Sequence, residues 1–409
     1  MKNILYTIAL LTLIIYSCNQ AAPIKKETVQ AEDSVQYYPP TPKTLDKQEF
    51  RHYVRLLNSL FESKLLSRNF NGSILIAKDG VPVYEKYVGF ADLRTKDIMT
   101  DSTPIHIAST SKTFTSVAIL RLVQENKLSL DDSIQRFFPG LPYPGITVKM
   151  LLSHRSGLPN YLYFMEKANW DKKQQVTNND VLHVLYTEKP NKTYQAGKRF
   201  NYCNTNFVLL ATIIEKISGM PFPQFMQKNF FGPLQMKHTF VFTLADMGKV
   251  VSSYNYNNTI WDNDYLEGTY GDKNIYSTPK DLLKWDQALY TDQLLRKSLL
   301  DTAFTPYSNE RPSIHNYGLG FRMLNLPNGK KVIYHFGRWH GFNAAFARLT
   351  EEKATIIILG NKFNRNIYSV AHKAYDLFGD YNQNHDDDED DDSKENKSRL
   401  TKGITLNKK

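Results

Sequence analysis

The sequence predicts an α/β fold of the α+β type, in which one antiparallel sheet is flanked by helices and accompanied by a mainly helical lobe. Strand-like runs occur near the front of the chain, over residues 72–89, and again near its back, over residues 317–359. The stretch between them, residues 128–290, contains helical patches and long loops instead. A sheet assembled from both ends of the chain, around a helical insert, is the simplest arrangement that buries every apolar face.

The strand-like runs are bounded by turn signals. Near the front, Gly72–Lys78 and Val81–Gly89 are joined by Asp79-Gly80, a strong two-residue hairpin signal. Asn328-Gly329 is a second hairpin turn near the back. The late β-rich runs, separated by turns, are Tyr317–Leu324, Lys331–His335, Gly341–Leu349 and Ala354–Leu359.

Helices are expected where apolar residues recur three and four positions apart. These segments are residues 46–67, Ser109–Asn126, Asn204–Ile217, Thr278–Leu289 and Ile367–Phe378. Ser218-Gly219 supplies a stop signal for the third segment. Pro279 fits the first turn of the fourth segment, where a missing N–H costs nothing.

Residues 1–18 are expected to be a lipoprotein signal peptide. After a short basic start, the run Ile4–Tyr16 is apolar except for two threonines, which is too short for a membrane span. The segment Leu13–Cys18 resembles a bacterial lipobox, in which Cys18 would be lipidated and become the mature N-terminus. The alternative is an ordinary signal peptide that is cleaved near Ala21 or Ala22.

The remaining chain divides by composition into three parts. Residues 19–45 are polar and proline-containing, so we expect a tether. Residues 46–380 form the folded domain, and residues 381–409, acidic and then basic with almost no large apolar side chain, are expected to be a disordered tail. The expected location is the cell envelope, with the protein lipid-anchored, facing the periplasm or the outer surface, and monomeric.

Charge and cysteine content restrict the partners. The formal net charge is +10, and the acidic block at residues 386–392 makes the rest of the chain more basic still. Basic and aromatic residues do not interleave, so no nucleic-acid partner is expected; the charge is either a solvated surface or an attraction to anionic lipid or cell-wall polymer. The chain has two cysteines, and once Cys18 is assigned to the signal, Cys203 stands alone without a disulfide partner.

Ser109-Thr110-Ser111-Lys112 carries the clearest chemistry. A serine hydroxyl needs a base to become a nucleophile, and a lysine three residues later lies on the same helical face. Ser109 could instead only cap the helix. A second copy, Ser277-Thr278-Pro279-Lys280, fits such capping: Ser277 or Thr278 would cap a helix, and Asp281 would complete a capping box.

Two further tripeptides could complete a site. Tyr202-Cys203-Asn204 begins a helix; the tyrosine could serve as a base or proton relay and the amide could hold the lysine or a substrate carbonyl, although Asn204 could also be an N-cap. His335-Phe336-Gly337 ends a strand, where glycine permits close backbone approach and the next N–H could join that of Ser109 in an oxyanion hole. Tyr256-Asn257-Asn258 and Lys78-Asp79-Gly80 match the same patterns and show that each is weak alone.

In this order the three motifs resemble those of the serine β-lactamase and penicillin-binding-protein family, in its class C and D-alanyl-D-alanine carboxypeptidase-like branch. The similarity spans residues 47–379. It includes three longer blocks: Leu151–Pro159 is similar to LLTHTSGLP, Ile275–Trp285 to LYST-x-x-DL-x-x-W, and His335–Phe342 to HTG-x-x-PGF.

The resemblance implies a role for each site residue. Ser109 is the acylated nucleophile and Lys112 its proton acceptor, while Tyr202 shares the base work and protonates the leaving group. The implied substrate-binding residues are Asn204, which positions Lys112 and the substrate amide, His335, which meets a substrate carboxylate, and Gly337 and Arg338, whose strand supplies the second oxyanion-hole N–H beside that of Ser109. His154 is implied to be structural. The implied fold has a five-stranded antiparallel sheet and an all-helical lobe.

Four residues, at three places in the chain, depart from the family pattern. His335 replaces the lysine of true β-lactamases, and a histidine is only partly charged near neutral pH. Lys273-Asn274 replaces a pair of glycines before the Tyr-Ser-Thr block. Cys203 replaces a serine and is either a small buried filler or a thiol close to the site.

The predicted function is an exported serine hydrolase that cleaves an amide or ester bond through an acyl-serine intermediate, without metal or cofactor. The expected substrate is a small molecule or a peptide, including peptides or esters of the D-Ala-D-Ala type. The alternative is a family member that no longer turns over and uses the cleft to hold penicillin or peptidoglycan.

Overall fold

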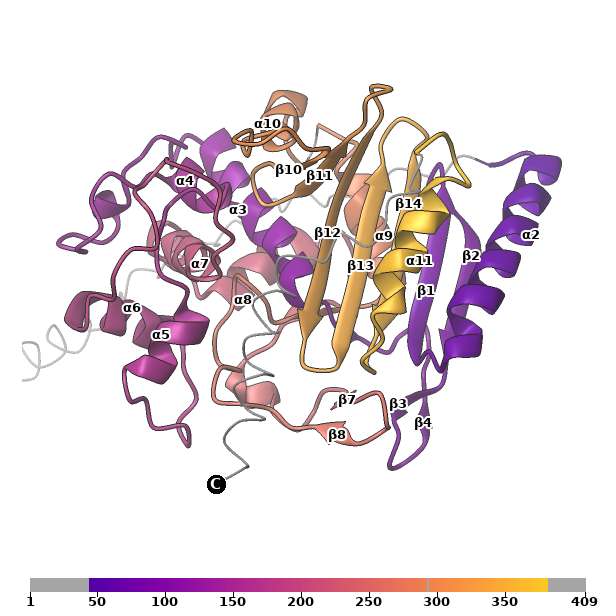
Figure 1. Ribbon diagram of the computed structural model, residues 1–409, viewed down its shortest axis with the longest axis horizontal. Coiled ribbons are helices and arrows are strands. Elements are labelled where there is room, and N and C mark those ends of the chain that lie inside the picture. The colour runs from indigo at the N-terminus through magenta and orange to yellow at the C-terminus, as the bar shows by residue number, and fades with distance from the viewer. Residues whose placement is uncertain (1–43, 293, 382–409) are drawn as a thin grey trace, which may run out of the picture. The chain divides into compact units, whose positions relative to one another are not determined.

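A computed structural model describes residues 44–292 and 294–381, and its centre is an antiparallel sheet of seven strands (Figure 1). The strand order is β10-β11-β12-β13-β14-β1-β2. In chain order the strands are β1 (Gly72–Lys78), β2 (Val81–Val88), β10 (His315–Tyr317), β11 (Arg322–Asn325), β12 (Lys331–Trp339), β13 (Phe342–Leu349) and β14 (Ala354–Gly360).

The predicted mixed fold with one antiparallel sheet is confirmed, and the sheet is wider than the expected five strands. The run Tyr317–Leu324, expected as one strand, is two short strands separated by a turn. A Cβ at Gly318 would lie 2.0 Å from the Ala303 carbonyl oxygen, and Gly320 has φ +79°. This close approach and left-handed backbone end β10 and reverse the chain into β11.

The front and back of the chain meet in the middle of this sheet. β1 pairs along its whole length with β14, from Gly72 opposite Gly360 to Lys78 opposite Ala354. Successive side chains of β1 point to opposite faces: Leu75 belongs to the core on one face and Ile74 to the core on the other. One sheet therefore separates two hydrophobic cores, and the register decides which core each side chain joins.

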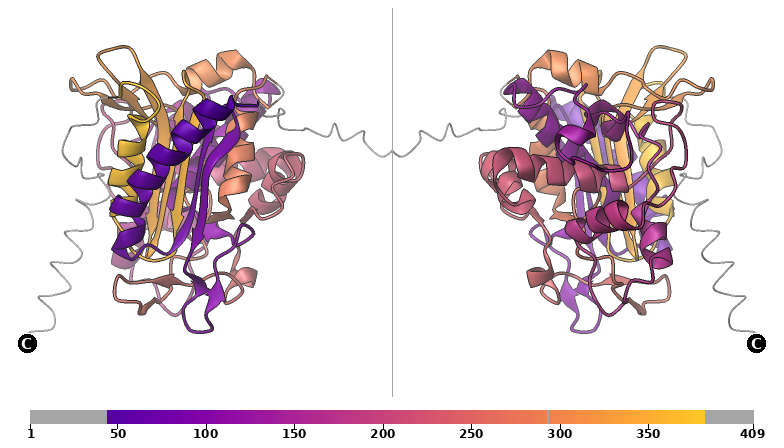
Figure 2. Two further views of the ribbon diagram at one scale, coloured as in Figure 1. Left: turned by 90° about the vertical axis from the view of Figure 1, so that its right-hand side faces the viewer. Right: turned by 90° about the vertical axis from the view of Figure 1, so that its left-hand side faces the viewer.

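Two terminal helices cover one face. α2 (Lys47–Lys64) and α11 (Asn366–Tyr375) lie together on this side, whereas most other helices lie on the opposite side (Figure 2). Asp46 accepts hydrogen bonds from the Gln48 and Glu49 N–H groups and so caps α2. Both helices agree with the segments predicted from periodicity.

The opposite face carries α3, α9 and the helical lobe. The helices of this side are α3 (Ser111–Gln124), α4 (Val148–Leu152), α5 (Tyr161–Lys167), α6 (Asn178–Thr187), α7 (Thr205–Ser218), α8 (Phe222–Met226), α9 (Pro279–Ala288) and α10 (Lys297–Ala303). Short helical turns are η1 (Leu66–Arg68), η2 (Ala108–Thr110), η3 (Ile134–Arg136), the π-helical η4 (Gln227–Phe231) and η5 (Leu244–Asp246). Small strands are β3 (Phe90–Asp92), β4 (Asp97–Ile98), β5 (Ile105–His106), β6 (Phe240–Val241), β7 (Ser253–Tyr254), β8 (Ile260–Trp261) and β9 (Ile275–Ser277).

Local signals set two helix boundaries in this lobe. α7 ends at Gly219, which has φ +68°, as its stop signal predicts. α9 is capped by Thr278, whose hydroxyl accepts from the Asp281 N–H, and Ser277 is the last residue of β9. The Asp281 carboxylate accepts from the His238 N–H and the Thr239 hydroxyl, so the second half of the expected capping box is replaced by a tertiary contact.

Several predictions concern residues outside the described part of the chain. The signal peptide 1–18 with its Cys18 lipidation site, most of the tether 19–45 and the tail 381–409 apart from Tyr381 lie there. Within residues 44–292 and 294–381, none of the helices combines the length and the apolar character needed to span a bilayer.

An ion pair fastens α9 to the sheet. Arg348 of β13 and Asp286 of α9 are almost completely buried, and the Arg348 Nε donates to the Asp286 carboxylate. The Thr355 hydroxyl donates to the other carboxylate oxygen at 2.6 Å. Charges in a dry core need such partners, since an unpaired one costs several kcal/mol.

Removal of one partner should therefore be costly. We expect Arg348→Met to lower the free energy of unfolding by about 3–5 kcal/mol, because it leaves Asp286 buried and uncompensated. The double variant Asp286→Leu with Arg348→Met should recover roughly 1–3 kcal/mol relative to additivity. Urea unfolding followed by circular dichroism measures both, and strictly additive losses would contradict this account of the pair.

Candidate active site

Ser109 lies in a strained turn at the base of α3. Ala108, just before it, has φ +48°, a left-handed conformation that alanine rarely adopts. The His106 ring holds this turn: its Nδ1 accepts from the Ala108 N–H at 3.1 Å, and its Nε2–H donates to the Asn274 Oδ1 at 2.8 Å. The N-cap of α3 is Thr110, so Ser109 does not serve as the helix cap.

Lys112, the second residue of α3, is fully buried and faces three acceptors. Its Nζ lies 3.1 Å from the Ser109 Oγ, 2.8 Å from the Asn204 Oδ1 and 2.8 Å from the Asp272 carbonyl oxygen. The amide and carbonyl oxygens can only accept hydrogen bonds. A neutral amine that donates its two N–H groups to them therefore has its lone pair left for the Ser109 hydroxyl proton.

Tyr202 and Asn204 enter the site at the start of α7. Asn204 occupies the N-cap position but makes no capping bond, because its carbonyl oxygen accepts from Lys112 instead. The Tyr202 ring is buried, with its centroid 5.0 Å from the Lys112 Nζ. Tyr256, the rival from the same pattern, is 73% exposed in the β7–β8 turn and is not part of this group.

β12 passes directly beside the nucleophile. A Cβ at Gly337 would lie 2.8 Å from the Ser109 nitrogen and 2.4 Å from the Ile107 oxygen, so only glycine fits there. A two-residue turn joins β12 to β13, so the residues that flank it, Trp339 and Phe342, form a hydrogen-bonded pair. By alternation the Arg338 N–H points the other way, toward the edge of β12 that β11 covers only as far as Tyr334.

His335 is close to this group but is not a cation. It is fully buried, and desolvation together with the charges of Arg322 and Lys112 holds its pKa well below the usual value. Its Nδ1–H donates to the Phe336 carbonyl at 2.7 Å, which leaves Nε2 to accept from the Tyr317 hydroxyl at 3.2 Å. Burial disfavours the charged form of His335, and both ring nitrogens already have partners, so the contact of His335 with a substrate carboxylate stays a prediction.

Arg322 is the cation that motif reasoning missed. Its guanidinium lies 5.1 Å from the centroid of the Tyr202 ring, and its charge lowers the pKa of both His335 and His154. It is only partly buried, unlike His335. No local pattern marks this arginine, and only the tertiary structure places it beside Tyr202.

The Lys273-Asn274 pair fills the position where glycines were expected. The Lys273 Nζ donates to the Tyr161 hydroxyl and to the Leu266 carbonyl, both at 2.9 Å. The Tyr161 hydroxyl in turn donates to the Asp272 carboxylate at 2.9 Å. These buried contacts fix the residue whose backbone carbonyl accepts from Lys112.

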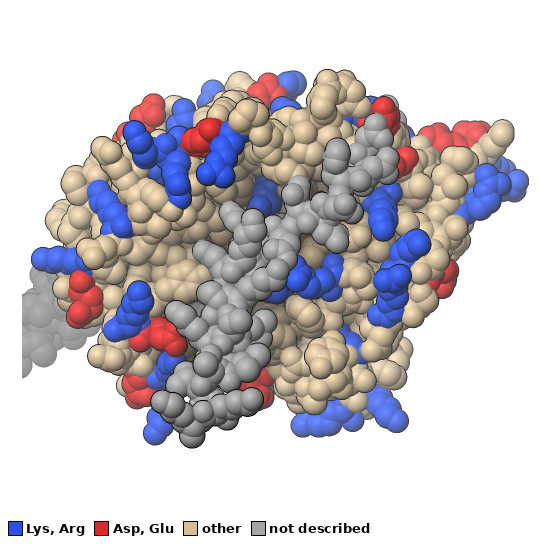
Figure 3. All heavy atoms as spheres, in the orientation of Figure 1, with Lys and Arg blue, Asp and Glu red and all other residues tan. Residues whose placement is uncertain are grey.

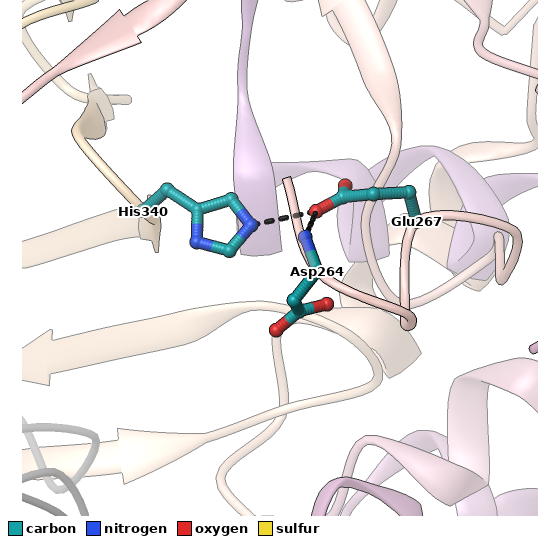
Figure 4. A group of neighbouring side chains, drawn as sticks. All are labelled: Asp264, Glu267 and His340. Atoms are coloured by element: carbon teal, nitrogen blue, oxygen red, sulfur yellow. Dashed lines mark hydrogen bonds and ion pairs between the residues drawn. The ribbon is translucent and has the colours of Figure 1, made fainter. Parts of the chain in front are cut away.

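Asp264, Glu267 and His340 form a group that could hold a metal ion by composition (Figure 4). Their geometry suits an internal ion pair better. The His340 Nε2–H donates to the Glu267 Oε1 at 2.6 Å, and the Trp339 indole N–H donates to Oε2 at 3.0 Å. Burial acts to raise the pKa of the Glu267 carboxyl, but these bonds and the charges of His340 and Lys273 outweigh it and lower the pKa to about 2.

This group connects the two walls of the site. Glu267 belongs to the loop that leads to Asp272, whereas Trp339 ends the β12 strand that carries Gly337 and His340 follows it in the turn. The Asn274 side chain also donates to the Glu267 and Thr269 carbonyls, at 2.6 and 2.8 Å. The loop that holds Lys112 and the strand beside Ser109 are therefore fixed to each other.

His154 and Cys203 support the site from behind. Both are buried, and the His154 Nδ1 accepts from the Cys203 N–H at 3.1 Å. The Cys203 thiol donates to the Leu158 carbonyl at 3.4 Å. Desolvation and the Lys112 charge hold the pKa of His154 well below its usual value. These contacts agree with a structural histidine and a buried cysteine filler.

Two comparisons with known proteins bear on the family of this chain. The model of a family described as Beta-lactamase matches residues 59–379. Penicillin-binding protein 4* of Bacillus subtilis (strain 168) is 32% identical over 332 residues, which cover 77% of this chain and 73% of that protein.

Two solved structures share the fold. A penicillin-binding protein from Bacillus halodurans superposes with a TM-score of 0.69 at 24% identity and covers 79% of this chain and 99% of its own. The octameric penicillin-binding protein homologue from Pyrococcus abyssi superposes with a TM-score of 0.68 at 27% identity and covers 79% of this chain and 76% of its own.

The buried histidines predict acid sensitivity. Desolvation lowers the pKa of His106 to about 4 from 6.5, against the opposing effect of its bond to Asn274. His106 therefore binds a proton near pH 6.5 in the unfolded chain, but only near pH 4 in the folded chain. The contribution of such a histidine to the free energy of unfolding is fully present above pH 6.5. It should fall as the pH drops toward 4, by about 1.4 kcal/mol per pH unit for each histidine.

Urea unfolding across this pH range tests the assignment. His106→Gln should reduce the dependence of the unfolding free energy on pH, because glutamine keeps an acceptor and a donor but does not titrate. His183 is exposed, so His183→Gln is the matched control and should leave the slope unchanged. An unchanged slope in His106→Gln would show that His106 does not carry the effect.

Proposed function

The chain belongs to the Beta-lactamase family of serine hydrolases, and from this premise we propose that it cleaves an ester or amide bond through an acyl-serine intermediate at Ser109. The observation that carries the proposal is the Lys112 geometry. Both oxygens that face Lys112 besides the Ser109 hydroxyl are pure acceptors. As a cation Lys112 donates to all three oxygens, and once it has lost a proton its lone pair faces the Ser109 hydroxyl. That is the arrangement of an activated nucleophile and its base.

The reaction follows from these positions. Lys112 takes the hydroxyl proton while the Ser109 Oγ attacks the substrate carbonyl carbon. The N–H groups of Ser109 and Arg338 stabilise the oxyanion. Tyr202 gives a proton to the leaving group as its bond to carbon breaks, and Asn204 positions Lys112 and the substrate amide. Water then attacks the acyl-enzyme, and its proton returns through the same groups.

The proposed substrate carries a carboxylate near the scissile bond, as in peptides or esters of the D-Ala-D-Ala type. Arg322 supports this, because it is a partly exposed cation beside Tyr202, whereas His335 is neutral. The likeness to a Bacillus subtilis penicillin-binding protein favours the same substrate class. Small or peptide substrates with a free acid group would be selected over neutral ones.

We also propose, on the sequence signals alone, that residues 46–380 act as an exported monomeric domain. Lipidation at Cys18 would anchor it to a membrane of the cell envelope, through the tether 19–45. The proposed chemistry uses neither a cofactor nor a metal, and no nucleic-acid partner is proposed.

Labelling of Ser109 tests the reaction. A fluorophosphonate or a fluorescent penicillin should form an adduct that mass spectrometry locates on Ser109, and Ser109→Ala should abolish it. Lys112→Ala should slow labelling by roughly a hundredfold or more, the effect of losing a general base. Lys280 of the second S-x-x-K copy is partly exposed and provides the matched control, since Lys280→Ala should label normally.

The labelling results decide between the proposed hydrolase and its alternatives. Labelling that survives Ser109→Ala would exclude the proposed nucleophile. An adduct that forms on Ser109 and is never released, from esters and D-peptides alike, would favour the non-turnover binding protein instead of the hydrolase.

A substrate pair tests the role of Arg322. Arg322→Met should raise KM for a D-Ala-D-Ala peptide by roughly 10- to 100-fold, the range for a lost charge-assisted hydrogen bond, and should spare its methyl ester. The exposed Arg311 is the matched control, and Arg311→Met should leave both substrates unaffected. Equal losses for the acid and the ester in Arg322→Met would exclude carboxylate recognition by this residue.

A further inference from the structure

A cavity of about 300 Å³ lies outside the site described above, where η1, the β7–β8 turn and the segment between β14 and α11 meet. Its lining includes three cations, Arg68, Lys362 and Arg365, together with the side chains of Tyr256 and Phe363. No acidic residue lines it. A cavity with several positive groups and no compensating carboxylate attracts an anion.

Lys362 is the most informative residue of this cavity. Its side chain is only 3% exposed, yet within residues 44–292 and 294–381 no hydrogen bond or ion pair to its ammonium group is present. Desolvation lowers its pKa accordingly. The residue is largely removed from water and its ammonium has no ionic partner in the described part of the chain, so an anion in the cavity would be attracted to it.

The backbone around Lys362 is held in place. The Tyr254 N–H donates to the Asn361 carbonyl, and the Phe363 N–H donates to the Tyr254 carbonyl, both at 2.9 Å. The Asn364 side chain donates to the Arg68 carbonyl at 3.3 Å, which ties this segment to η1. The positive groups therefore come from segments that are fixed to one another before any ligand binds.

The cavity lies next to the active-site strand but on its other side. Gly337 faces Ser109, so alternation along β12 places the Arg338 side chain on the opposite face. There the Arg338 guanidinium lies 6.0 Å from the centroid of the Phe363 ring. Lys and Arg side chains are numerous on the lower right of the molecular face in Figure 3, below the position of α11 in Figure 1.

We propose that this cavity binds the phosphate group of a ligand. Lys362 supplies a positive charge from the cavity wall, and Arg68 and Arg365, which are exposed, contact the phosphate oxygens from the rim. The rings of Tyr256 and Phe363 cover the carbon part of the ligand. The phosphate belongs either to a lipid head group or to a soluble phosphate ester; the recognition chemistry is the same.

The first test uses the full chain and inorganic phosphate. Phosphate should raise the melting temperature saturably, beyond the effect of sodium chloride at equal ionic strength, because a ligand that binds only the folded state stabilises it. Lys362→Met should weaken this response at least tenfold. Lys173 is an exposed lysine in the loop after α5, so Lys173→Met is the matched control and should respond as the parent does.

A second readout separates binding from structure. In phosphate-free buffer Lys362→Met should unfold at the same or a higher urea concentration than the parent, since it removes a partly desolvated charge that has no ionic partner among the described residues. If that variant fails to fold, the double variant Arg68→Gln with Arg365→Gln, at exposed positions, should show the same loss of the phosphate response. A response to phosphate no larger than to chloride, or one that these variants retain, would overturn the proposal.

Vesicles distinguish the two sources. Sedimentation with phosphatidylglycerol vesicles should be reduced by Lys362→Met if the ligand is a lipid head group. If Lys362→Met leaves vesicle binding unchanged but loses the phosphate response, the ligand is a soluble phosphate ester. Either outcome supports the phosphate site. If Lys362→Met retains both the vesicle binding and the phosphate response, the site is excluded.

Discussion

Burial of the Lys112 side chain is the constraint on which the rest of the site depends. Its terminal nitrogen has no access to water, so each hydrogen bond that it makes must come from the protein. The acceptors, Ser109, Asn204 and Asp272, come from η2, the start of α7 and the loop before β9, up to 160 positions away in the sequence. An unsatisfied partner would cost about 1–3 kcal/mol or more, so these segments are required to converge.

That convergence is maintained by a second buried network. Glu267 contacts Trp339 and His340 from the end of β12, while Lys273 reaches Asp272 through the Tyr161 hydroxyl. Both Glu267 and Lys273 lie in the loop where the family pattern predicted a pair of glycines. Side-chain hydrogen bonds here define a loop shape that two glycines would leave to backbone packing. The same loop holds His106 through Asn274, and His106 in turn holds the strained residue before Ser109.

Most of the sheet could be predicted from the sequence because its signals are local. β1 begins and ends at the predicted residues, and β13 and β14 differ by one residue at one end, since continuous apolar runs and turn residues define them. β12 extends to Trp339, four residues beyond its prediction, because the β13 pairing continues past Gly337. The split of β10 from β11 depends on contact between Gly318 and Ala303. No pattern within residues 317–324 predicts this contact.

The candidate site likewise has features that the sequence predicts and features that depend on the tertiary structure. The sequence alone determined that Ser109 and Lys112 share one helical face and that Tyr202, Asn204 and Gly337 follow in the family's order, because spacing along a helix and motif order are properties of the chain. Only the tertiary structure decided that burial disfavours a charge on His335, that Arg322 lies beside Tyr202 and that Thr278, not Ser277, caps α9. The physical reason is that charge and hydrogen bonding depend on burial and on neighbours that distant segments contribute.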